Sequence, residues 1–266
     1  MKKLILAVFV VSFCIFNLKA EQNFNQNNSN VISTQENITK IPVTQFETMC
    51  DEGDAKACIT VYEMQKDPFI AFKFAQKACE FKELKGCNYM AVSYYLGRGV
   101  KQDYKKSFEI YKDSCAKGNL NACQSIGIMY RDGRGVKQDV KRAIEILSSL
   151  CHSEQILACE PLATVYSSDE YGLKDVSKAF DYFDMACAGS ISKTACKRAF
   201  NEKFVIQACE DKNARACLIA GHFASKKRDI DAIKFYQKSC EYKFEKGCIR
   251  LKELIESLNL IANYKY

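Results

Sequence analysis

Cysteine is the residue type in this chain with the most chemistry to offer, and all its cysteines but Cys14 fall into pairs. One pair, Cys187 with Cys196, has a spacing of nine residues, and six pairs have a spacing of eight: Cys50 with Cys58, Cys79 with Cys87, Cys115 with Cys123, Cys151 with Cys159, Cys209 with Cys217, and Cys240 with Cys248. Residues eight apart within one helix are separated by about 12 Å. A disulfide needs Cα atoms within roughly 4.4–6.8 Å of each other. The pairs can therefore bond only if the chain turns between them.

Glycines near these intervals favour such a turn, because helix ends favour glycine. They are Gly53, Gly86, Gly118, Gly189 and Gly247. We therefore interpret each pair as a disulfide across a helix–turn–helix. Zinc is the alternative, but zinc sites use closer cysteine spacings and usually recruit histidine, and the chain has only His152 and His222. We expect no metal and no cofactor.

Two further motifs could carry chemistry. Ser190-Ile-Ser-Lys193 matches the S-x-x-K of serine β-lactamases, but it lies in a predicted turn, with no S-D-N or K-T-G to accompany it. The glycines of 97–99 and 133–135 lack the strand and third glycine of a phosphate-binding loop, so we interpret them as structural links. The catalytic residues stay unassigned.

The first twenty residues have the pattern of a signal peptide, with two lysines before a short apolar run and Ala20 as the cleavage point. Cleavage would remove Cys14 and leave an even number of cysteines, which is typical of an oxidising compartment. We therefore expect a secreted or periplasmic protein without a stable membrane span. Residues 21–40 are rich in Asn, Gln and Ser, which predicts a disordered leader, and we expect a single domain over residues 41–266.

The charge balance is mild once the signal is removed. Loss of Lys2, Lys3 and Lys19 takes the formal net charge from +7 to +4. With no arginine cluster and no interleaved aromatic platform, the sequence argues against a nucleic-acid partner. We expect a monomer.

The chain repeats with a period of 36 residues from Cys79 to Cys187, which indicates stacked supersecondary units. In each unit, apolar or small residues follow the second cysteine at three, four and seven positions, as on one face of a helix. These residues are Met90, Ala91 and Tyr94; Ile126, Gly127 and Tyr130; and Leu162, Ala163 and Tyr166. We expect this first helix to begin at the second cysteine.

A Gly-x-Gly-Val link separates the first helix from a second one. Aspartates stand where the second helix needs an N-cap, and they are Asp67, Asp103, Asp139, Asp175 and Asp229. The short interval from Cys196 to Cys209 predicts two very short helices or one bent helix. An apolar pattern predicts a capping helix over about residues 247–266, through Leu251, Leu254, Ile255, Leu258 and Ile261.

The helix face and its link resemble Sel1-like repeats. The residues that carry this resemblance are Ala91, Tyr94, Gly97, Gly99, Val100 and Asp103, and then Gly127, Tyr130, Gly133, Gly135, Val136, Asp139 and Ala143. With one cysteine pair in each unit, the chain over about residues 41–266 resembles the Helicobacter cysteine-rich proteins. The resemblance implies an all-α fold, an αα-superhelical solenoid of disulfide-linked Sel1-like (tetratricopeptide-like) repeats. It also implies export, penicillin binding and β-lactamase activity, although the departure at Cys187–Cys196 and the short unit could remove a binding surface.

A concave binding surface is the other candidate for function, since stacked helix pairs curve. Positions one, five and eight after the second cysteine form what we call the polar stripe, apart from the core face. The stripe contains Asn88, Val92, Tyr95, Gln124, Ile128, Arg131, Glu160, Thr164, Ser167, Leu218, His222 and Ser225. Of these, we predict ligand binding by Asn88, Tyr95, Gln124, Arg131, Glu160, Thr164 and His222.

Two functions therefore stay open. One is a β-lactamase that binds β-lactams or peptidoglycan fragments, and the other is a non-catalytic secreted scaffold for a peptide or protein ligand. A solvated helix face is the alternative for the stripe, because surface polar residues need no special role.

Overall fold

The computed structural model describes residues 42–153, 155–189, 192–227 and 230–263, with side chains described up to Leu258. The predicted signal peptide and leader lie outside these residues. The described residues form α-helices and one 3₁₀ turn, without a strand among them. They divide into two compact units, one ending at Gly86 and one beginning at Cys87. No helix in the described part of the chain combines the length and apolar character that crossing a membrane requires.

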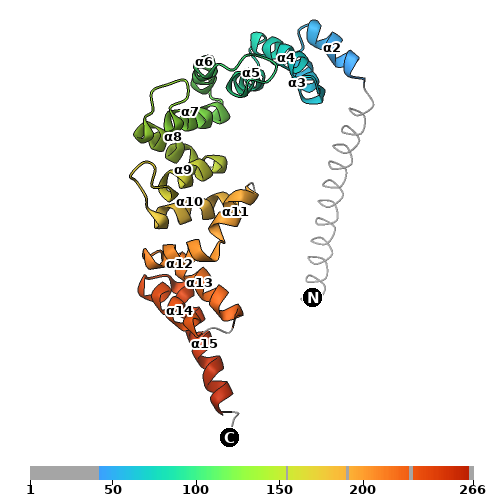
Figure 1. Ribbon diagram of the computed structural model, residues 1–266. Coiled ribbons are helices and arrows are strands. Elements are labelled where there is room, and N and C mark those ends of the chain that lie inside the picture. Colours follow the sequence, from blue (N-terminus) through green and yellow to red (C-terminus); the bar gives the residue numbers. More distant parts are fainter. Residues whose placement is uncertain (1–41, 154, 190–191, 228–229, 264–266) are drawn as a thin grey trace, which may run out of the picture. The chain divides into compact units, whose positions relative to one another are not determined.

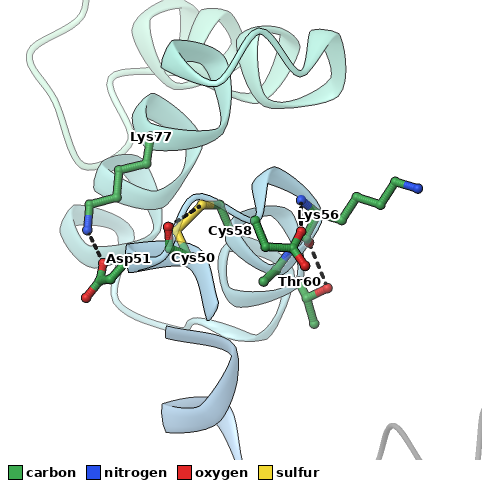
Figure 2. The surroundings of a disulfide bond; sticks show 8 residues. Cys50, Asp51, Lys56, Cys58, Thr60 and Lys77 are labelled. Carbon is green, nitrogen blue, oxygen red and sulfur yellow. Dashed lines mark hydrogen bonds and ion pairs between the residues drawn. A yellow bond between two sulfur atoms is a disulfide. The ribbon is translucent and has the colours of Figure 1, made fainter. Parts of the chain in front are cut away.

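The first unit contains α2 (Val43–Asp51), α3 (Ala55–Met64), α4 (Pro68–Glu80) and the start of α5 (Leu84–Leu96). Figure 2 shows the turn between α2 and α3, where Cys50 and Cys58 are joined with their Cα atoms 4.7 Å apart. Lys77 of α4 forms an ion pair with Asp51 at the end of α2. The three helices therefore pack as one small cluster around the disulfide.

The second unit continues as a series of helices, each packed against the next along the chain (Figure 1). After α5 come α6 (Tyr104–Ala116), α7 (Leu120–Asp132), α8 (Val140–His152), η1 (Ile156–Ala158), α9 (Cys159–Ser167), α10 (Val176–Ala188), α11 (Lys193–Ala199), α12 (Glu202–Glu210), α13 (Ala214–Lys226), α14 (Asp231–Glu241) and α15 (Glu245–Asn263). The predicted all-α repeat fold is confirmed.

Disulfides cross the turns as the spacing predicts. In the six pairs whose geometry is defined, the Cα atoms lie between 4.5 and 4.9 Å apart. Cys79 and Cys87 are disulfide-bonded as well. Such a density of disulfides indicates folding in an oxidising compartment outside the cytoplasm.

The two disulfides nearest the C-terminus follow the same rule. Cys209 at the end of α12 is bonded to Cys217 of α13, and their Cα atoms lie 4.5 Å apart. Cys240 near the end of α14 is bonded to Cys248 of α15, with the Cα atoms 4.6 Å apart. The ladder of cross-linked turns therefore continues past the short unit to the last helix.

Most of the first helices begin earlier than the cysteine spacing predicts. Helices α7, α13 and α15 start three residues before their cysteines, which are Cys123, Cys217 and Cys248. For α7 and α13 the cause is the asparagine that precedes the helix, because its side chain accepts a hydrogen bond from a backbone N–H in the first turn. The second cysteine therefore lies inside the first turn of a helix, facing the end of the preceding helix.

The second helices begin as predicted wherever the structure describes their caps. Asp103, Asp139 and Asp175 each accept a hydrogen bond from the backbone N–H three residues on. Asp67 caps α4 directly before Pro68. Asp229 lies outside the described residues, and α14 starts at Asp231 without a side-chain cap.

The short unit contains two short helices, α11 and α12, rather than one bent helix. Because they are short, α10 also contacts α12, and residues of α10 reach the start of α13. Asp184 of α10 pairs with Nε of Arg215 at 2.8 Å. Nδ2 of the buried Asn213 donates to Oδ1 of Asp181 at 2.8 Å. These polar contacts connect the regular repeats on either side of the short unit.

The buried carboxyl of Asp184 predicts a characteristic pH dependence of stability. Burial raises its pKa above the ordinary value of 3.8, and the Arg215 guanidinium opposes that shift without cancelling it. A raised folded-state pKa gives stability that is present below the unfolded-state value and is lost as the pH rises through the folded-state value. We therefore expect the melting temperature of wild type relative to Asp184→Asn to fall as the pH rises above about 3.8.

Asp175 provides a control of opposite sign. Burial alone would raise its pKa, but hydrogen bonds from the Lys178 backbone and side chain outweigh burial and lower it below 3.8. The melting temperature of wild type relative to Asp175→Asn should therefore fall as the pH falls through that lowered value. Scanning calorimetry measures both differences in melting temperature. If both differences changed with pH in the same direction, the opposite pKa shifts assigned to Asp184 and Asp175 would be wrong.

Candidate functional site

Several residues of the polar stripe are engaged by the next repeat. The Tyr95 hydroxyl accepts a hydrogen bond from Nη1 of Arg134 at 2.7 Å, and this arginine belongs to the following link. The Arg134 guanidinium lies 5.4 Å from the Tyr95 ring and 5.6 Å from the Tyr104 ring. Nε2 of Gln124 donates to the carbonyl of Leu157 at 3.1 Å. These side chains hold neighbouring repeats together.

Of three other stripe residues, two contact a neighbouring side chain and the third has a buried polar atom. Nε of Arg131 lies 2.6 Å from Oδ1 of Asp132, and both side chains are largely buried. Oε2 of Glu160 accepts a hydrogen bond from Oγ of Ser192 at 2.5 Å. Oδ1 of Asn88 is buried, and no described residue forms a hydrogen bond with it. Ligand binding by these residues stays a prediction.

An open pocket of about 640 Å³ lies at the short unit, and we call it the short-repeat pocket. Its lining comes from four successive helices and the residue before the last of them: Thr164, Ser167, Phe183, Thr194, Lys197, Arg198, Asn201 and Phe204. Thr164 and Ser167 belong to the polar stripe, so the structure brings one predicted ligand-binding residue, Thr164, to this pocket. The shortening of the repeat thus makes a concave site here.

The local sequence explains how the pocket forms. Ser192 caps α11 by accepting from the Ala195 N–H, and Asn201 caps α12 by accepting from the Phe204 N–H. Only one residue, Phe200, separates the end of α11 from that second cap. The chain therefore enters α12 directly after α11, which has only 7 residues.

The pocket combines an aromatic floor with positive charge. The rings of Phe183 and Phe204 meet edge to face with centroids 5.9 Å apart. The Arg198 guanidinium lies 5.4 Å from the Phe183 ring centroid, within the range of a cation–π contact. Lys197 and Arg198 are both exposed. Such a site is suited to an apolar group that carries or neighbours an anion.

His222 lies in a second pocket, of about 380 Å³, formed by α13, α14 and α15. Its ring meets Tyr236 edge to face at 5.7 Å. Burial, and then the positive charges of Arg250 and Lys226, lower the pKa of His222 below 6.5. Arg250 also lines the pocket, but its Nη1 lies 2.7 Å from a carboxylate oxygen of Glu253. The histidine is therefore a neutral packing partner of Tyr236 at neutral pH.

The S-x-x-K match has a structural role in its described half. Ser192 is the N-cap of α11, and Lys193 is the first residue of that helix and is exposed. Ser190, the serine that would act as nucleophile in the motif, lies outside the described residues. Within the described ranges, no group of three or more His, Cys, Asp or Glu could hold a metal ion.

Fold and site together define a class of protein: an all-α array of helix pairs, cross-linked by disulfides, with a pocket on its polar stripe. The Sel1 repeat family model matches residues 62–80, 84–119, 120–152 and 162–190. The chain therefore contains Sel1 repeats over these residues.

Three solved structures are similar to parts of the chain. A protective antigen of uropathogenic Escherichia coli is 19% identical, over 81% of this chain and 59% of its own, with a TM-score of 0.40. A putative Sel1 repeat protein of Klebsiella pneumoniae is 18% identical, over 80% of this chain and 99% of its own, with a TM-score of 0.47. Cysteine-rich protein B of Helicobacter pylori is 24% identical, over 44% of this chain and 89% of its own, with a TM-score of 0.36. No curated protein sequence matches the chain.

Sequence reasoning missed most of the short-repeat pocket. Six of its lining residues come from α10, α11 and α12 or from their connection, and none was singled out as a ligand-binding residue: Phe183, Thr194, Lys197, Arg198, Asn201 and Phe204. The available signal was the irregular spacing of Cys187, Cys196 and Cys209. A break in a repeat exposes helix faces that the next repeat would otherwise cover.

Proposed function

We propose that this protein is a non-catalytic scaffold outside the cytoplasm that binds a peptide segment of a partner protein in the short-repeat pocket. The observation that carries the proposal is the pocket itself, which has an aromatic floor and two exposed cations beside it. Sel1 repeats commonly mediate protein binding. A concave, partly apolar pocket with a few convergent polar groups is the usual form of a binding site.

A steric block of the pocket tests this function. Thr194 is exposed and lines the pocket, whereas the neighbouring Lys193 is exposed and does not. We expect peptides selected from a random display library to share a consensus and to bind wild type with micromolar affinity. Thr194→Trp should weaken that binding at least tenfold, because the indole occupies the space of the ligand.

Lys193→Trp is the matched control and should bind within twofold of wild type. Selection of no shared consensus, or equal binding by both tryptophan variants, would contradict the proposed site. Circular dichroism of each variant checks that the helical content is unchanged.

β-Lactam hydrolysis is the activity that the family resemblance implies, and it stays a prediction. The reaction needs a nucleophile with a base and an oxyanion site, and the described part of the S-x-x-K match serves as a helix cap. We therefore favour the scaffold function over β-lactam hydrolysis. Turnover of a chromogenic β-lactam by the purified full chain, above that of a Sel1-repeat protein without the pocket, would reverse this order.

A further inference from the structure

We propose that the short-repeat pocket selects a peptide in which a carboxylate lies next to a bulky apolar side chain. This inference rests on the proposed function and names its ligand class. The first support is charge, because the described residues of the lining include Lys197 and Arg198 but no acidic residue. Within the part of the chain that the structure describes, neither cation is in an ion pair.

Acidic residues close in sequence to the lining residues have partners outside the lining. Glu160 accepts a hydrogen bond from Ser192, Asp184 pairs with Arg215 at 2.8 Å, and Glu202 pairs with Lys227, the residue after α13, at 2.5 Å. These three carboxylates are therefore directed to other groups. Charge complementarity favours an anion from outside the chain.

The second support is the position of Arg198. Its guanidinium lies over the Phe183 ring, which meets the Phe204 ring. A guanidinium held against an aromatic face keeps its N–H groups available for bidentate contact with a carboxylate. An apolar side chain that follows the carboxylate would then contact Phe204, which is only partly buried, while Phe183 lies beneath as a buried ring.

The third support is the hydrogen-bonding capacity of the lining. Oδ1 of Asn201 is used by the Phe204 N–H, which leaves its amide NH₂ as a donor. The hydroxyls of Thr164 and Ser167 donate to backbone carbonyls of their own helix. The amide NH₂ of Asn201, together with Lys197 and Arg198, therefore provides the donors for the acceptor atoms of a carboxylate and a peptide carbonyl. A pocket of about 640 Å³ falls in the usual size range of ligand sites.

Two sources could supply the carboxylate, and the experiment separates them. The probes are four peptides titrated by calorimetry into the full chain, produced in an oxidising compartment. Acetyl-Gly-Ser-Glu-Phe-Gly-Ser-amide carries the side-chain carboxylate, and the same peptide with Gln for Glu removes it. The same peptide with Ser for Phe removes the apolar group, and acetyl-Gly-Ser-Gln-Phe with a free C-terminus moves the carboxylate to the chain end.

We expect the Glu-Phe peptide to bind at least tenfold more tightly than either the Gln-Phe or the Glu-Ser peptide. Its affinity should fall at least tenfold in Arg198→Gln and in Lys197→Gln. Lys193→Gln and Lys203→Gln remove the same charge from exposed sites outside the lining and should bind within twofold of wild type. Stronger binding of the C-terminal peptide would assign the carboxylate to a chain end and would still support the ligand class.

Charge reversal keeps the test decisive if a neutral variant loses structure. Arg198→Glu should bind a Lys-Phe peptide more tightly than wild type does. Equal affinity for the Glu-Phe and Gln-Phe peptides would overturn the inference while leaving peptide binding in place. Failure of library selection to yield any peptide that Thr194→Trp blocks would instead overturn the proposed function itself.

Discussion

Replacing Cys151 and Cys159 together with alanine lowers the free energy of unfolding by about 3–5 kcal/mol, the upper part of the range expected for loss of a native disulfide. The bond joins the end of α8 to the start of α9, and both cysteines are almost fully buried. A closed loop of about nine residues accounts for roughly 2–3 kcal/mol through the entropy of the unfolded chain. The remainder comes from the space left when two buried sulfur atoms are removed.

The disulfide between Cys115 and Cys123 is the matched control. It closes a loop with the same separation of 8 residues, but both cysteines are only partly buried. Its double alanine variant should therefore lose only the loop contribution of about 2–3 kcal/mol. Urea titrations followed by circular dichroism measure both variants. A loss below about 1 kcal/mol for each would show that the disulfides do little for stability.

Loss of a disulfide should have a large effect on stability because a repeat array has few other stabilising contacts. Each repeat contacts only its neighbours, and a typical domain is stable by only about 5–15 kcal/mol. Complete reduction removes the bonds of fourteen cysteines. We expect the fully reduced chain to lose its cooperative unfolding transition.

The helices could be predicted from the sequence because their signals are local. Capping aspartates such as Asp139 and helix-face residues such as Ile126 act within a few positions of the chain. The predicted starts of most first helices were wrong by three residues because the second cysteine lies inside the first turn and does not mark its boundary. Asn119, four positions before Cys123, is the true cap of α7.

The pocket could not be predicted because it depends on distances between helices. Phe183, Arg198 and Phe204 come together only through the lengths of α11 and α12 and the short connection between them. The same limit applies to Tyr95, which the sequence marks as an accessible stripe residue. Its hydroxyl is engaged by Arg134, which lies 39 residues further along the chain.

The link that carries Arg134 depends on Gly135. Its φ is +73°, and a Cβ there would lie 2.2 Å from the carbonyl oxygen of Tyr104. The left-handed conformation costs an ordinary residue roughly 1–2 kcal/mol, and this backbone contact cannot be relieved by a side-chain rotation. We therefore expect Gly135→Ala to cost about 3 kcal/mol or more, since the whole link must move away from α6.

Gly172 separates the two contributions to that cost. Its φ is +64°, but no atom lies within 4 Å of the position that a Cβ would take. Gly172→Ala should lose only the conformational part, about 1–2 kcal/mol, or roughly 2–8 °C in melting temperature for a chain of this size. Gly135→Ala should lower the melting temperature by at least about 6 °C. Because the Arg134–Tyr95 contact is then already broken, adding Arg134→Ala should lower the melting temperature little further. Equal melting temperatures for the two glycine variants would mean that the link does not fix the spacing between repeats.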